Sequence, residues 1–180
     1  MEQIFNTIVF DLDGTLVDTA ADLAAATNQA LEPIGRRPVT EIEVRGMIGG
    51  GFPNLIDQGL RATGGPLEGD AFDEVVAKSQ AYYTAHVADL TRPFPGVTDA
   101  LAAFAKDGIK MGVCTNKPAA AAQAILDQVG LAEYLPVLVG GDSLSVMKPD
   151  PAMIMAVLDR LEATLANAVL VGDSETDVAL

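Results

Sequence analysis

Two carboxylates follow a short apolar run near the start of the chain, where residues 8–15 read IVFDLDGT. A buried strand rarely ends in charged side chains without partners for them, because removing an unpaired charge from water is costly. Side chains of an extended chain alternate between two faces, so Asp11 and Asp13 are expected on the same side. Together they could bind a hard cation such as Mg²⁺, and one of them could act as a nucleophile. Taken alone, such a pair is more often a solvated turn or the start of a helix.

The same pattern, an apolar run followed by polar residues, occurs three more times. The runs are KMGVC at 110–114, PVLVG at 136–140 and AVLV at 168–171. Each is typical of a buried strand, and helical stretches separate them, which predicts an α/β fold with a Rossmann-like parallel sheet. Ligands of such sheets bind beyond the carboxyl ends of the strands. The polar residues after the runs are therefore expected along one edge of the sheet: Asp11, Thr115, Lys148 and Asp173.

These polar segments resemble the four motifs of the haloacid dehalogenase-like hydrolase superfamily. They are DLDGT at 11–15, TNKP at 115–118, Lys148-Pro149 and GDSETD at 172–177, and they span nearly the whole chain in order. Within the superfamily, bacterial phosphoglycolate phosphatases are the most similar. That resemblance rests on DTAADL at 18–23, VRGMIGGG at 44–51 and PFPGV at 93–97.

The resemblance implies a role for each matching residue. Asp11 is the expected nucleophile, which forms an aspartyl-phosphate intermediate, while Asp13 protonates the leaving alkoxide and later activates water. Dehalogenases lack this second aspartate, so its presence favours a phosphatase. Thr115 and Lys148 are the expected phosphoryl contacts, and Asn116 is a further candidate for substrate binding. The expected Mg²⁺ ligands are Asp11, Asp173 and the backbone carbonyl of Asp13.

Each of these side chains also has a purely structural explanation. Thr115 could be a hydroxyl satisfied by backbone at a strand end, Lys148 a solvated loop residue, and Asn116 the N-cap of a helix. Asp177 could complete a capping box that begins at Ser174, or it could orient Lys148 or metal-bound waters. Further candidate substrate contacts are Lys117, Arg45 and the loop Gly49–Gly51. Arg45 could instead be a solvated helix residue, and the loop could simply join two helices.

Composition excludes several classes of function. The net charge of −14 argues against nucleic acid or an anionic membrane as a partner, and no apolar run approaches the length of a membrane span. The single cysteine, Cys114, permits no intramolecular disulfide and lies in an apolar run, which predicts a buried thiol and a cytoplasmic location. His86 is the only histidine, so a histidine-based metal centre is not expected.

The strand and helix alternation stops between about residue 18 and residue 92. That stretch is expected to be helical, with breaks at Pro33–Pro38, Gly49–Pro53 and Gly64–Gly69. We therefore expect a catalytic core from residues 1–17 and 93–180 and a helical cap from residues 18–92. The core is expected to be shortened at its C-terminus, because members of the superfamily usually continue beyond the position of Leu180. Its fourth strand could then be an exposed edge of the sheet.

The expected function is the Mg²⁺-dependent hydrolysis of a small phosphorylated metabolite by a monomer or homodimer, with 2-phosphoglycolate as the leading substrate. One alternative is a phosphatase for a sugar phosphate or pyrophosphate. A second alternative is a phosphate-binding or interaction domain that is inactive because its C-terminal segment is lost. The complete set of aspartates and Lys148 favours an enzyme over the inactive domain.

Overall fold

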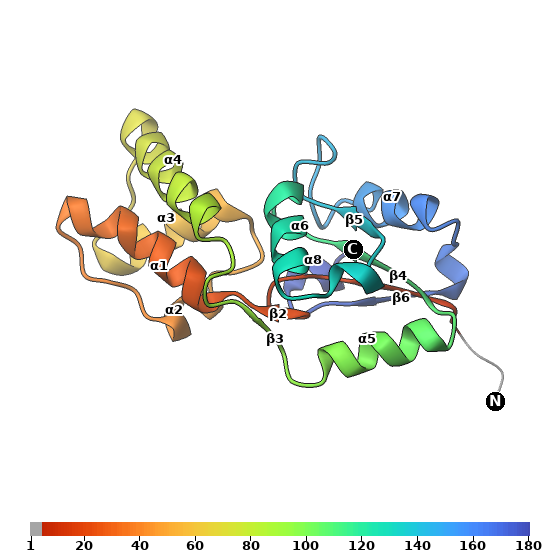
Figure 1. Cartoon of the computed structure of the whole chain (residues 1–180). Helices are drawn as coiled ribbons and strands as arrows, with labels where there is room; N and C mark the ends of the chain where they lie inside the picture. Colours follow the sequence, from red (N-terminus) through yellow and green to blue (C-terminus); the bar gives the residue numbers. More distant parts are fainter. Residues whose placement is uncertain (1–4) are drawn as a thin grey trace. The chain divides into compact units, whose positions relative to one another are not determined.

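A computed structural model describes residues 5–180 of the chain. The chain forms two compact units, one that runs up to Asp18 and resumes with Arg92–Leu180, and one that contains Thr19–Thr91. The expected fold class is confirmed, because the first unit has a parallel sheet with helices and the second unit is helical (Figure 1).

Four parallel strands form the sheet of the first unit, in the order β5-β4-β1-β6. Their bounds are Thr7–Phe10 for β1, Lys110–Cys114 for β4, Val137–Val139 for β5 and Ala168–Val171 for β6. Strand β1 is buried along its whole length between two neighbours, which accounts for its continuous apolar sequence. The sequence predicts this strand from Ile4, but Ile4 lies outside the described residues. Strand β6 is an edge strand, as expected, and its Val169 and Val171 side chains are exposed.

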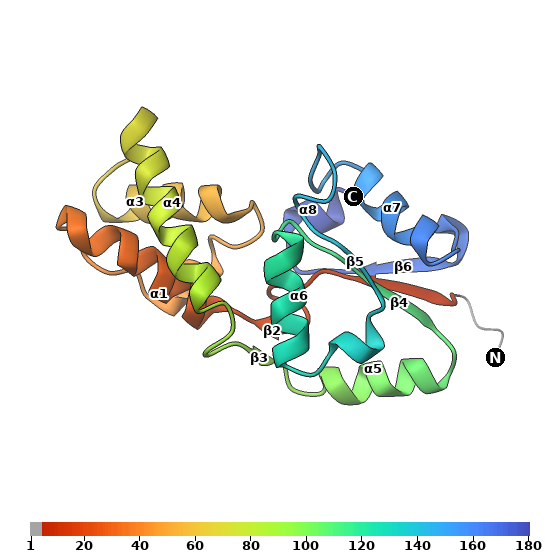
Figure 2. The same ribbon diagram turned by 45° about the horizontal axis from the view of Figure 1, so that its top comes forward.

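Helices cover both faces of this sheet (Figure 2). Right-handed crossovers place helices α5 and α6 on one face and helix α7 on the other, because the chain reverses its direction across the sheet after β5. The helices are Val97–Lys106 (α5), Ala119–Gln128 (α6), Ala152–Arg160 (α7) and the short Glu175–Val178 (α8), with 3-10 turns at Ala132–Tyr134 and Leu165–Asn167. Buried side chains of α7 such as Met153 and Val157 form one core with Val9, Cys114 and Val139 of the strands.

The second unit is built from four helices joined by short loops. They are Ala20–Leu31 (α1), Glu41–Arg45 (α2), Phe52–Thr63 (α3) and Gly69–Ala85 (α4), and a 3-10 turn at Glu32–Ile34 follows α1. The breaks between them fall at the expected proline and glycine clusters. Their apolar faces form a separate core that includes Leu23, Val44, Ile56, Leu60 and Tyr83.

The sequence predicts a capping box from Thr19 to Asp22 at the start of α1, and this prediction is wrong. Thr19 occupies the N-cap position, but its side chain makes no capping hydrogen bond. Asp22 accepts hydrogen bonds instead from the backbone amides of Leu90 and Thr91 and from the Thr91 hydroxyl, at 2.7–3.1 Å. Its carboxylate therefore ties the first helix of this unit to the unit's last residues.

A short antiparallel ladder lies where the chain leaves and re-enters the first unit. Strand β2, Val17–Asp18, pairs with strand β3, Arg92–Pro93. The expected domain boundaries, after residue 17 and after residue 92, fall within this ladder. Across residues 5–180, no helix combines the length and the apolar character that a bilayer crossing requires.

Candidate active site

Pairing beyond the strand ends holds the first site residues in place. The backbone amide of Asp11 donates to the carbonyl of Val171 at 2.8 Å, and the amide of Thr115 donates to the carbonyl of Val139 at 3.0 Å. The ladders between β1 and β6 and between β4 and β5 thus continue one residue further. Asp11 and Thr115, both buried, are consequently fixed at the same edge of the sheet, as the parallel arrangement requires.

Lys148 lies between two carboxylates at this edge. Its Nζ atom is 2.9 Å from Asp11 and 2.7 Å from Asp177, and its side chain is 1% exposed. A buried ammonium group is stable only where nearby carboxylates offset its desolvation, and here two of them do so. Asp177 also accepts a hydrogen bond from the Ser174 amide at 3.0 Å, which completes the capping box of α8. Both roles that the sequence leaves open for Asp177, capping and orienting Lys148, are therefore present together.

Asn116 holds the backbone of Lys148. The Lys148 amide donates to Asn116 Oδ1 at 2.8 Å, and Asn116 Nδ2 donates to the Lys148 carbonyl at 3.2 Å. The alternative of an N-cap at Asn116 is wrong, because Pro118 occupies that position for α6 and the amide of Ala119 donates to Asp142. The polar side-chain atoms of Asn116 bind Lys148 and so join the second motif to the third.

Asp13 forms a buried ion pair with Lys117. The Lys117 Nζ atom lies 3.0 Å and 2.9 Å from the two Asp13 oxygens, and the side chains are 4% and 12% exposed. The backbone of Lys117 is held in turn, because its carbonyl accepts from Gly141 and its amide donates to the Thr115 hydroxyl. Gly141 permits this approach, since a Cβ atom there would lie 2.3 Å from the Asn116 carbonyl oxygen.

Asp173, which follows β6, is seated against the loop after β1. The Thr15 hydroxyl donates to Asp173 Oδ1 at 3.0 Å. Gly14 leaves room for the carboxylate, because a Cβ atom at that position would lie 2.1 Å from Asp173 Oδ2. The position of the Asp173 carboxylate therefore depends on Gly14 and Thr15, two uncharged neighbours in the DLDGT segment.

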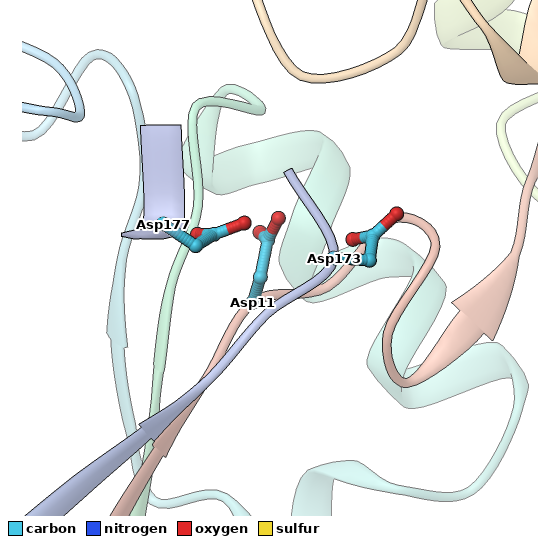
Figure 3. A group of neighbouring side chains, drawn as sticks. All are labelled: Asp11, Asp173 and Asp177. Atoms are coloured by element: carbon cyan, nitrogen blue, oxygen red, sulfur yellow. The ribbon is translucent and has the colours of Figure 1, made fainter. Parts of the chain in front are cut away.

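The carboxylates at this edge form a set that fits a divalent cation. Ligand oxygens of Asp11, Asp173 and Asp177 all lie within 4.8 Å of one another (Figure 3). With Asp13, four carboxylates face the two ammonium groups of Lys148 and Lys117, which leaves two negative charges for a metal ion to neutralise. Hard carboxylate oxygens are the donors that Mg²⁺ prefers. The sequence predicts Asp11 and Asp173 in this set and a contribution from Asp13, whose carboxylate is paired with Lys117.

Burial and charge shift the ionisation of this cluster. Burial, together with the charges of Asp177 and Asp13, raises the pKa of Asp11 to about 6 although Lys148 lowers it. Burial alone would lower the pKa of Lys148, but Asp11 and Asp177 outweigh it and raise that pKa overall. Hydrogen bonds from Lys148 and Ser174 outweigh burial at Asp177 and hold its pKa below the ordinary range. Such opposed shifts within one cluster are typical of functional sites.

Other residues singled out in the sequence lie elsewhere in the fold. The thiol of Cys114 is buried, and burial raises its pKa to about 12, so it is a packing residue and no nucleophile. His86 and Arg45 are exposed in the helical unit, and Gly49–Gly51 leads into the start of α3.

The contacts of Lys117 with Asp13 and of Thr15 with Asp173 were not predicted from the sequence. Among the described residues, Lys117 and Lys148 are the only buried lysines or arginines. A signal for this was available, because each lysine directly follows a predicted strand or its loop, where a long cationic side chain can reach the carboxylates. The sequence could not show which aspartate each lysine would meet.

Comparison with known proteins identifies the family. Residues 8–179 match the model of the haloacid dehalogenase-like hydrolases. A phosphoglycolate phosphatase of Cereibacter sphaeroides is 42% identical over 172 residues, which are 96% of this chain and 78% of that protein. The phosphoglycolate phosphatase of Caulobacter vibrioides is 38% identical over 95% of this chain and 72% of its own length.

A solved structure has the same fold. The crystal structure of a predicted phosphoglycolate phosphatase from Haemophilus somnus superposes with a TM-score of 0.90 at 30% identity, over 99% of this chain and 81% of that one. The chain belongs to the haloacid dehalogenase-like hydrolase family. It is an enzyme of the phosphoric monoester hydrolase class, which confirms the resemblance seen in the motifs.

Proposed function

We propose that the protein hydrolyses a small phosphate monoester in a Mg²⁺-dependent reaction through an aspartyl-phosphate intermediate. The observation that carries the proposal is the buried contact of Asp11 with Lys148, beside the carboxylates of Asp173 and Asp177. Asp11 is the nucleophile, and Lys148 offsets its repulsion from the phosphate. Mg²⁺, held by Asp11, Asp173 and the backbone carbonyl of Asp13, would supply neutralising charge to the phosphoryl oxygens.

The residues of the first two motifs perform the proton transfers and the binding. An Asp11 oxygen attacks phosphorus as the ester oxygen leaves, and Asp13 gives that oxygen a proton. Asp13 then takes a proton from the water that cleaves the aspartyl phosphate, which regenerates Asp11 and releases phosphate. Thr115 donates its hydroxyl to the phosphoryl group. Asn116 contributes by holding Lys148, and its own contact with substrate stays a prediction.

The proposed substrate is 2-phosphoglycolate, because relatives that share about 40% of this sequence are named phosphoglycolate phosphatases. Residues 18–92 would act as a cap that excludes water and selects the substrate, and the enzyme would work in the cytoplasm. A sugar phosphate or pyrophosphate is the alternative substrate, since the phosphate-handling residues do not distinguish one ester from another.

The test compares 2-phosphoglycolate, a sugar phosphate, pyrophosphate and p-nitrophenyl phosphate, each with Mg²⁺ and with EDTA. We expect turnover only with Mg²⁺, a preference for 2-phosphoglycolate, and inhibition by Ca²⁺, because its larger and looser coordination sphere disturbs in-line attack. Asp13→Asn should spare p-nitrophenyl phosphate more than the alkyl ester, since a good leaving group needs little acid assistance. Full activity in EDTA would contradict the metal assignment.

A further inference from the structure

The site contains two buried lysines, and the chemistry described so far uses only one. Lys148 is enclosed between Asp11 and Asp177 and serves the phosphoryl group. Lys117 contacts Asp13, the residue proposed to protonate the leaving oxygen. The two cations are therefore assigned to opposite ends of the breaking bond. A lysine buried beside the leaving portion of the substrate has a use if that portion is itself negatively charged.

We propose that Lys117 recognises a second anionic group on the leaving alcohol and so selects phosphate monoesters that carry a carboxylate close to the ester oxygen. This inference rests on the proposed function, because Asp13 is taken to contact the leaving oxygen. One hydrogen bond from that oxygen to Asp13 and one from Asp13 to Lys117 place the ammonium group within roughly 6 Å of the leaving oxygen. A carboxylate carbon two bonds from the ester oxygen, as in 2-phosphoglycolate, lies within that span.

The seat of Lys117 suits recognition. Its backbone is fixed at both the amide and the carbonyl, by Thr115 and Gly141, so little conformational freedom is lost when substrate binds. An ammonium group has three donors and can serve Asp13 and a substrate carboxylate together. The low exposure of the side chain, 4%, strengthens its attraction for an anion relative to that of a solvated lysine. A local cation is also needed because the chain carries a net charge of −14, which repels an anionic substrate.

The experiment measures kcat and KM for two esters of the same length, 2-phosphoglycolate and 2-hydroxyethyl phosphate, which has a hydroxymethyl group in place of the carboxylate. Wild type should prefer the carboxylate ester. Lys117→Met should lower kcat/KM for 2-phosphoglycolate, relative to that for 2-hydroxyethyl phosphate, by about 30-fold or more, mainly through KM. Lys117→Arg should restore part of the preference. Lys106→Met, which removes an exposed charge from the same unit, is the matched control and should leave the ratio unchanged.

The ratio of the two esters separates recognition from a structural role. Any loss of folded protein, or any effect on Asp13, is common to both esters and cancels in the ratio. Equal losses on both esters, or a wild type without preference for the carboxylate, would overturn the inference while the phosphatase proposal stands.

A binding measurement tests recognition without turnover. Phosphonoacetate and ethylphosphonate are titrated by calorimetry into the Mg²⁺ form, since only the former carries a carboxylate. Lys117→Met should weaken phosphonoacetate by about 30-fold and leave ethylphosphonate unchanged. Absence of all hydrolysis by wild type would defeat the proposed function, and this titration would then decide the inference separately. Equal affinities of wild type and Lys117→Met for phosphonoacetate would overturn it.

Discussion

At the scale of single residues, the site is a set of charges held apart from water and close to one another. Opposed effects act on the ionisation of Asp11. Burial and two further carboxylates disfavour its ionised form, whereas one neighbour, Lys148, favours it. The protein therefore keeps the proposed nucleophile in surroundings that do not favour its charge. Such an arrangement lowers the free energy of unfolding, which is a common cost of a reactive site.

Asp11→Asn should abolish turnover, because an amide keeps the shape but loses the nucleophile. The same change should stabilise the protein in EDTA. The pKa of folded Asp11 is about 6 against an ordinary 3.8, so the folded state holds the proton more tightly and loses stability as the pH rises through that interval. The variant lacks this loss, and its advantage should grow to at most about 3 kcal/mol between pH 4 and pH 7.

Urea unfolding of both proteins in EDTA at several pH values measures this advantage. A variant that is less stable than wild type at pH 7, or an advantage that shrinks as the pH rises, would contradict the reasoning. Turnover of the variant within tenfold of wild type would remove Asp11 as nucleophile.

Asn116→Ala should lower kcat for p-nitrophenyl phosphate by about tenfold or more, because Lys148 loses the two hydrogen bonds that position its backbone. Asn28 offers a matched control, since it holds Val39 through the same pair of bonds in the helical unit. Asn28→Ala should cost a similar free energy of unfolding, about 1–3 kcal/mol, with little change in kcat. Equal effects of the two variants on kcat would show that the Asn116 contact serves stability alone.

At the scale of elements, the site depends on loops that follow strands and approach one another closely. The turn after β1 brings Gly14 against Asp173, which follows β6, and both a positive φ of 84° and the lack of space require glycine there. Gly96 has nearly the same φ, 85°, but a Cβ atom there would meet nothing within 4 Å. The two glycines thus separate the cost of backbone strain from the cost of displacing a side chain.

Gly14→Ala should weaken Mg²⁺ binding by about tenfold or more, because the new methyl group displaces the Asp173 carboxylate. Gly96→Ala should lose about 1 kcal/mol of stability from strain and keep its metal affinity. Calorimetric Mg²⁺ titrations of both variants make the comparison. Equal Mg²⁺ affinities in the two variants would argue against Asp173 as a metal ligand.

At the scale of the whole molecule, the helical unit is closed by one buried carboxylate. Asp22 in α1 accepts hydrogen bonds from Leu90 and Thr91, where the chain returns to the first unit. Its loss would remove the acceptor of these hydrogen bonds, two of which come from the buried Thr91 at the end of the helical unit.

Asp22→Ala should therefore destabilise the protein by about 3 kcal/mol and speed hydrogen exchange at the Leu90 and Thr91 amides. Asp73→Ala, which removes an exposed carboxylate from α4, is the control and should change stability by less than about 0.5 kcal/mol. Unchanged exchange at the two amides would show that the closure of the unit does not depend on Asp22.

The sequence by itself determined the fold class and the family, and it supplied the candidate site residues. The apolar runs at residues 8–10 and 111–114 mark strands because both are buried, and burial on both faces of a parallel sheet leaves no polar positions within them. The parallel order of those strands then places Asp11, Thr115, Lys148 and Asp173 at one edge. Strand bounds and loop breaks can be predicted from the sequence because they depend on the types of consecutive residues.

Only the tertiary structure decided which residues these polar side chains contact. Asp22 was expected to cap its own helix and instead binds residues nearly 70 positions away, because a buried carboxylate takes the donors that folding brings to it. Likewise, Asn116 binds Lys148 rather than a helix terminus, and Lys117 meets Asp13 across 104 positions. Sequence spacing specifies contacts within one turn or one strand, whereas ion pairs between distant loops depend on where separate elements end in space.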